Sequence, residues 1–150
     1  MNEPESKRQS FERWLPVADV PAYFGDYSLH DDFDGLRVIL HPAKGSDRDL
    51  VITFGRAVLG YRVFEEFAHP RLHQETSADP SPEWPWGTYP LLIIRDSEWL
   101  ATFSDSQLAP WFEQVEHYFF YTLSNSFDVL AHAQPEVHWQ PMQLPIDRNA

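Results

Sequence analysis

The pattern of aromatic, β-branched and polar residues between positions 115 and 139 fits two neighbouring strands joined by a tight turn, and this stretch anchors our prediction of the fold. Residues 117–123 and 126–132 are rich in aromatic and β-branched types, which are typical of strands on a half-buried sheet. Ser124 and Asn125 can form a two-residue turn between them, because asparagine tolerates positive φ. The pattern therefore predicts a β-hairpin, followed by a proline exit.

The predicted hairpin has two chemically different faces. With a turn at Ser124-Asn125, Phe120 lies opposite Val129 on an apolar face, which we expect to belong to the core. The other face mixes apolar, hydroxyl and ionisable groups, and it pairs Tyr121 with Asp128, Phe119 with Leu130, and His117 with His132. We expect this mixed face either to be covered by a helix or to form a shallow groove.

A second hairpin is predicted near the N-terminus. Asp34-Gly35 is a strong turn signal, because both residues accept positive φ. It joins two predicted strands, residues 27–33 and 36–41. This register places Asp32 opposite Arg37, so we interpret the aspartates near the turn as structural residues and not as metal ligands.

Short strands and short helices are expected in the rest of the chain. Further strands are predicted at residues 50–54, 61–67 and 90–95, the last in the middle of the sheet because it is almost wholly apolar. Ser10 and Ser97 can cap helices at residues 11–15 and 98–104, and residues 108–115 can add another helical turn.

The order of these elements predicts an α+β fold, with a mainly antiparallel β-sheet and one or two short helices packed on one face. A chain of 150 residues suits one domain with a sizeable core. We therefore expect residues 1–150 to form a single domain, in which residues 1–9 and 140–150 are loose tails.

The charge of the chain is strongly acidic, with a formal net value of −12. An acidic surface repels phosphate backbones and anionic lipids, so we expect neither nucleic-acid binding nor membrane binding. The same field would attract a basic protein partner and speed the encounter. An alternative interpretation is that the charge only maintains solubility.

Cysteine is absent, which excludes disulfides, zinc-thiolate sites and thiol nucleophiles. The N-terminal residues are polar, so the sequence shows no signal peptide, and no run reaches the roughly 20 apolar residues that span a bilayer. We expect a cytoplasmic protein.

One long loop is predicted at residues 74–88, and it contains Trp84 and Trp86 among three prolines. Tryptophans on a stiff loop make good binding anchors at low entropic cost. They could equally fold back and shield the edge of the sheet. Both interpretations remain open at the level of sequence.

Catalytic signatures are missing from the chain: we find no phosphate-binding glycine loop, no GxSxG elbow and no HExxH. His117 and His132 could hold a metal, but no third ligand stands at a suitable spacing. We therefore predict no catalytic residue, no metal and no cofactor. The candidate binding residues are Trp84, Trp86, Tyr121, Asp128, His117 and His132.

The segment from Ser97 to Trp139 resembles one that recurs in small bacterial proteins of unassigned function, some of which are described as immunity proteins of toxin systems. The matching features are Asp96-Ser97 after an apolar strand, Trp99, His117-Tyr118, Phe127-Asp128-Val129, Pro135 and, near the N-terminus, Leu29-His30-Asp31. The resemblance covers about half of the chain. It implies a single α+β domain from a bacterium and implies no catalytic residue.

Three hypotheses about function follow. The first is a non-enzymatic, acidic binding protein, immunity-like, that masks a basic toxin. The second is a small-molecule or metal-dependent enzyme that uses the mixed face of the hairpin, with His117, His132, Tyr121 and Asp128 as candidates. The third is a structural homo-oligomer that buries the tryptophan loop between subunits.

Overall fold

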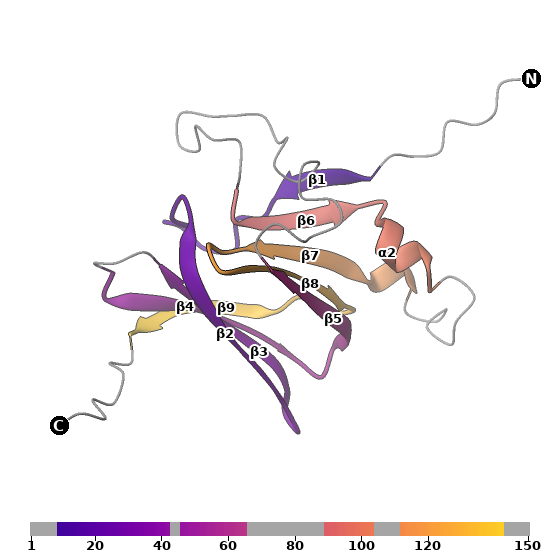
Figure 1. Cartoon of the computed structure of the whole chain (residues 1–150). Coiled ribbons are helices and arrows are strands. Elements are labelled where there is room, and N and C mark those ends of the chain that lie inside the picture. Colours follow the sequence, from indigo (N-terminus) through magenta and orange to yellow (C-terminus); the bar gives the residue numbers. More distant parts are fainter. Residues whose placement is uncertain (1–8, 43–45, 66–88, 104–111, 143–150) are drawn as a thin grey trace, which may run out of the picture.

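Two antiparallel sheets form the part of the chain that the computed structural model describes, namely residues 9–42, 46–65, 89–103 and 112–142 (Figure 1). The five-stranded sheet has the order β1-β6-β7-β8-β5, with bounds Ser10–Arg13, Leu91–Arg95, Glu116–Tyr121, Asn125–Ala131 and Val58–Glu65. The four-stranded sheet has the order β2-β3-β4-β9, with bounds Phe24–Asp32, Gly35–Pro42, Arg48–Gly55 and Glu136–Pro141. The predicted, mainly antiparallel sheet is confirmed, but it is divided in two.

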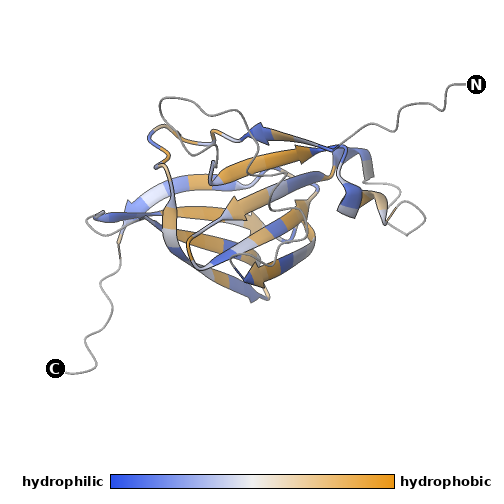
Figure 2. Cartoon of the chain, turned by 45° about the horizontal axis from the view of Figure 1, so that its top comes forward, coloured by the Kyte–Doolittle hydropathy of each residue, from blue (hydrophilic) through white to orange (hydrophobic). Residues whose placement is uncertain are grey.

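An aromatic core lies between the two sheets. Phe54 of β4 contacts Tyr118 and Phe120 of β7, at ring-centroid distances of 5.3 and 6.2 Å. Phe120 also stacks on Phe127 of β8, with centroids 4.7 Å apart. Phe120 and Val129 are fully buried, which confirms the predicted core face. Figure 2 shows how the hydrophobic residues gather on the strands of both sheets.

The β7–β8 hairpin is shifted by two residues from the predicted register. The observed pairs include Phe120 with Phe127, Tyr118 with Val129, and His117 with Leu130. The turn is centred one residue earlier than predicted, because Thr122 lies opposite Asn125: the Thr122 N–H donates to the Asn125 carbonyl at 3.0 Å, and the Thr122 hydroxyl accepts the Asn125 N–H at 3.0 Å and donates to the same carbonyl at 2.7 Å. The predicted pair of His117 with His132 is therefore wrong. Since the shift is even, each side chain keeps its predicted face.

The β2–β3 hairpin is also shifted by two residues. Phe33 and Asp34 form the turn, the Asp34 N–H donates to Asp32 Oδ1 at 2.9 Å, and Gly35 begins β3 with a φ of 100°. The positive φ therefore falls on the glycine alone and not on an Asp34-Gly35 pair. As a result Arg37 lies opposite His30, and the predicted pairing with Asp32 is wrong.

Helix is scarcer than predicted in the described residues. The expected helix at residues 11–15 is wrong, because residues 10–13 form the edge strand β1 and pair with β6. Ser97 does cap a helix, but α2 (Glu98–Ala101) is only four residues long. The 3₁₀ turn η1 (Phe112–Gln114) lies within the predicted helical segment 108–115, whose first four residues fall outside the described ranges.

The three other predicted strands are confirmed as β4, β5 and β6, and β6 lies inside its sheet, between β1 and β7. The tail predicted from residue 140 begins too early, because Gln140 and Pro141 belong to β9. Val137 and Trp139 of that strand pair with Ile52 and Leu50 of β4. Their side chains pack against the core, which explains why this segment is held in the sheet.

Candidate functional site

A chain of buried polar side chains crosses the five-stranded sheet on its face away from the core. Ser97 Oγ lies 2.6 Å from His117 Nδ1, and His117 Nε2 lies 2.6 Å from Asp128 Oδ1. Arg62 Nε donates to Asp128 Oδ2 at 3.1 Å. We call these four residues the polar chain; they come from β5, β7, β8 and the residue before α2.

Strand alternation and one strained residue bring the polar chain together. His117 and Asp128 point away from the core because they alternate with Tyr118 and Val129, which point into it. Asp96 has a φ of 52°, a left-handed conformation that turns the chain sharply from β6 into α2. This turn places the next residue, Ser97, over His117.

The hydrogen bonds of the polar chain place a proton on one nitrogen of His117. Asp128 is a carboxylate paired with Arg62 and can only accept, so Nε2 of His117 donates to it. In a neutral imidazole, Nδ1 accepts the hydroxyl proton of Ser97, whereas in an imidazolium it donates to the Ser97 oxygen. The same hydroxyl oxygen accepts the N–H of Leu100 at 3.0 Å, which caps α2.

Trp99 of α2 covers this polar chain. The Arg62 guanidinium lies 4.4 Å from the centre of the Trp99 ring, and the His117 ring lies 5.5 Å from it in an edge contact. Asp128 is 0% exposed and His117 is 2% exposed. The charge of Asp128 is therefore balanced by Arg62, and the Trp99 ring lies against this arginine.

The residue types of the polar chain are those of a nucleophile, a base and an orienting carboxylate. A working nucleophile must also meet a substrate atom at roughly 3 Å, with donors for the developing oxyanion. Ser97 is only 7% exposed, and both sides of its hydroxyl are already engaged by His117 and Leu100. The geometry therefore favours a structural tie that holds α2 on the sheet.

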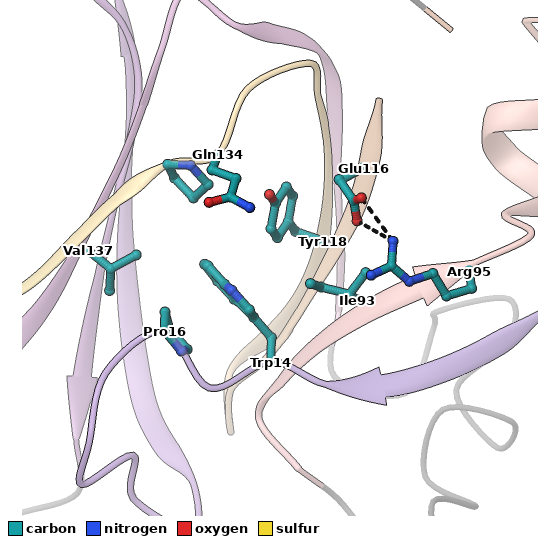
Figure 3. Close-up of a pocket in the computed structure, with 9 residues that line it drawn as sticks. Trp14, Pro16, Ile93, Arg95, Glu116, Tyr118, Gln134 and Val137 are labelled. Carbon is teal, nitrogen blue, oxygen red and sulfur yellow. Dashed lines mark hydrogen bonds and ion pairs between the residues drawn. The ribbon is translucent and has the colours of Figure 1, made fainter. Parts of the chain in front are cut away.

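A cavity of about 290 Å³ opens where β1 and β9 form the margin of the two sheets (Figure 3). Trp14 and Tyr118 line it together, with ring centroids 4.9 Å apart. Arg95 also lines it, but its guanidinium donates to Glu116 at 2.8 Å and to Glu12 at 3.1 Å. Because two carboxylates already neutralise this arginine, the cavity offers an anion little favourable charge interaction.

Alkaline pH should destabilise the protein through buried tyrosines. Burial, and to a lesser degree the charge of Glu116, raises the pKa of Tyr118 to about 12, and burial raises that of Tyr89 to about 12 as well. The unfolded chain releases these protons from about pH 10, so the contribution of the two tyrosines to the free energy of unfolding should be constant below that pH and be lost toward pH 12.

Urea denaturation at a series of alkaline pH values measures this loss. Tyr118→Phe should make the decline shallower, because it removes one of the two phenols whose pKa is raised to about 12. An unchanged slope in that variant would contradict the assignment.

A third feature is an exposed surface where the edge strand β2 of one sheet meets the edge strand β5 of the other. It combines three exposed apolar or aromatic side chains with five exposed carboxylates, and we call it the acidic seam. Its residues are Asp26, Asp31, Asp32, Phe33, Asp34, Tyr61, Val63 and Glu65. Phe33 is 86% exposed, Val63 41% and Tyr61 37%.

Contacts between the two sheets hold the acidic seam together. The Tyr61 hydroxyl donates to Asp31 Oδ2 at 3.0 Å, and this hydrogen bond, followed by burial and the Asp31 charge, raises the pKa of Tyr61. Arg56 Nε donates to the Phe33 carbonyl at 3.0 Å, and its guanidinium lies 4.4 Å from the centre of the Phe33 ring. At the far end, Ser124 donates to Asp26 at 3.0 Å.

The structure brings together only some of the residues predicted as binding candidates. His117 and Asp128 meet directly, whereas Tyr121 lies on the same face opposite Ser126. His132 lies beyond the end of β8, where its backbone N–H donates to Ala57. Trp84 and Trp86 fall outside the described residues.

Sequence reasoning missed Ser97 and Arg62 as members of the polar chain. Ser97 was identified only as a helix cap, and the capping signal does not reveal a second partner. Arg62 lies directly opposite Asp128 in the β5–β8 pairing, but 66 residues separate them in the sequence. Only knowledge of the strand order could have connected them.

Comparisons with protein-family models, with curated proteins and with solved structures found no match. Among the described residues, no group of three or more histidine, aspartate or glutamate side chains could hold a metal ion. In the same ranges, no helix is long and apolar enough to cross a membrane.

Proposed function

We propose that this protein is a non-enzymatic binding protein that recognises a basic protein partner, in the manner of a bacterial immunity protein that masks a toxin. The observation that carries the proposal is the sign of the exposed charges. Within the described ranges, three exposed arginines, Arg37, Arg56 and Arg95, stand against twelve exposed carboxylates, Glu12, Asp19, Asp26, Asp31, Asp32, Asp34, Asp47, Glu65, Asp96, Glu98, Glu113 and Glu136.

This excess of carboxylates acts over long distances. A net charge of −12 attracts a cationic protein before contact and orients it during the encounter. The field weakens as salt is added, since the Debye length shrinks to about 10 Å at 0.1 M ionic strength. We also propose that the protein acts in the cytoplasm, and the absence of cysteine fits that reducing compartment.

The two competing hypotheses receive less support. Catalysis on the mixed face of the hairpin would need access to His117, and α2 covers that residue through Trp99. A homo-oligomer would have to bring together two copies that each carry a charge of −12, which costs electrostatic energy unless basic surface faces the carboxylates. Light scattering of the purified protein tests this alternative directly.

The proposal predicts that association depends steeply on salt. The probe is the product of the adjacent gene, which the proposal expects to be a basic protein, and stopped-flow fluorescence measures its association rate. We expect the rate constant to fall by at least about tenfold between low salt and 0.5 M NaCl. A rate that ignores ionic strength, or a neighbouring gene product that is not basic or does not bind, would overturn the proposal.

A further inference from the structure

We infer that the acidic seam is the docking surface for the partner, and that its occupant is an arginine-bearing segment that also inserts an apolar side chain. This inference rests on the proposed function and specifies where and how the partner binds. It depends on three features of the seam: exposed apolar side chains, an excess of carboxylates, and an arginine that lies over one of the aromatic rings of the seam.

Two of the three apolar or aromatic side chains of the seam, Tyr61 and Val63, occupy core-facing positions but stay partly exposed. Tyr61 and Val63 of β5 lie opposite Val129 and Phe127, both of which are fully buried on the core face. By strand pairing all four share that face. Tyr61 and Val63 nevertheless remain 37% and 41% exposed. Exposed apolar surface with a polar rim is typical of an interaction site.

The charges around this apolar surface select a cationic occupant. Five exposed carboxylates belong to the seam, and Arg56 contacts it at Phe33. A partner that buried apolar surface here without bringing positive charge would leave carboxylates desolvated and unpaired. A basic segment avoids that cost, because it pairs with them.

Arginine suits this seam better than lysine. The guanidinium carbon of Arg56 already lies over the Phe33 ring, 4.4 Å from its centre, while Nε donates to the Phe33 carbonyl, so the molecule itself contains such a contact. The ring of Tyr61 stands beside Asp31 and offers the same combination of an aromatic face and an acceptor. Arginine stacks on aromatic faces and forks onto carboxylates, whereas lysine presents a compact point charge.

The test uses the whole protein and two soluble 12-residue peptides, one alternating arginine with valine and one alternating arginine with serine. Titration calorimetry gives the affinities at fixed low salt. We expect the arginine–valine peptide to bind more tightly, and Val63→Thr to reduce that preference. Equal affinities for the two peptides in the wild type would contradict a role for the apolar side chains.

A charge-matched pair of triple variants locates the site. The seam variant is Asp31→Asn, Asp32→Asn and Asp34→Asn, and the control is Asp47→Asn, Glu113→Gln and Glu136→Gln, which removes three exposed carboxylates elsewhere. We expect the seam variant to lose about 30-fold in affinity for the arginine–valine peptide, at about threefold per exposed pair. The control should lose less than about threefold.

Equal losses in both variants would overturn the seam as the docking surface while leaving the salt-dependent partner binding of the proposed function intact. Salt-independent binding of the neighbouring gene product would instead overturn the proposed function. Thermal melting of both variants confirms that they are folded, which is expected because all six substituted side chains are exposed.

Discussion

Replacing Asp128 with alanine should lower the free energy of unfolding by about 3–5 kcal/mol, the usual cost of breaking a buried ion pair from one side. The substitution leaves Arg62 without its buried carboxylate and His117 Nε2 without an acceptor. Water cannot easily replace the acceptor of His117, which is 2% exposed, whereas the Arg62 side chain is 29% exposed and can be partly rehydrated. Urea denaturation of the purified variant measures the change.

Asp49→Ala is the matched control for this substitution. Asp49 is also buried, at 3% exposure, and its carboxylate lies 3.0 Å from His41 Nδ1. The side chain of His41 is 33% exposed, so water can solvate it once the partner is removed. We expect a loss of about 1–2 kcal/mol. Losses of equal size at the two positions would show that the polar chain contributes no more to the free energy of unfolding than this half-exposed pair.

Replacing Gly35 with alanine should cost about 2–5 kcal/mol through two effects. Gly35 has a φ of 100°, which L residues other than glycine seldom adopt, and the added strain is about 1–2 kcal/mol. A Cβ built there would also lie 2.1 Å from the backbone carbonyl of Gly55 and 2.6 Å from the nitrogen of Arg56. Backbone atoms cannot move aside as a flexible side chain can, so overpacking adds about 1–3 kcal/mol.

Gly55→Ala separates these two effects. Gly55 also has a positive φ, of 62°, but a Cβ added there meets nothing within 4 Å. The Gly55→Ala variant should therefore lose only the conformational contribution to the free energy of unfolding, about 1 kcal/mol. Thermal or urea denaturation of the two single variants gives the comparison. If Gly35→Ala were no worse than Gly55→Ala, the close approach of the β3 and β4 backbones would not matter to stability.

Local pattern was sufficient to predict the sidedness of the β7–β8 hairpin. Successive side chains of a strand point to opposite faces, so Tyr118, Phe120 and Val129 point away from His117 and Asp128 for any register shift of an even number of residues. The Ser97 cap was predictable for the same reason. The register was not predictable in the same way, because it depends on the turn, and the Thr122 hydroxyl fixes that turn one residue earlier through hydrogen bonds that a propensity rule does not include.

Strand pairing between distant residues determines the secondary structure of segments whose local pattern fits more than one element. Residues 10–13 alone fit a short capped helix, but pairing with β6 gives Phe11 an apolar neighbour, Ile94, and gives Glu12 the guanidinium of Arg95. The acidic seam shows the same limit. Its charge could be predicted from composition, but its position arises only where the edges of two different sheets meet.

The central claim is that the protein works through its exposed carboxylates, while the polar chain only maintains the fold. The most direct measurement compares two variants in their affinity for the product of the adjacent gene. One is Ser97→Ala, measured at a temperature where it is folded, and the other is the triple variant with Asp31, Asp32 and Asp34 replaced by asparagine. We expect the first to bind within about twofold of the wild type and the second to lose about 30-fold. Lost binding in Ser97→Ala, with full binding by the triple variant, would contradict the claim.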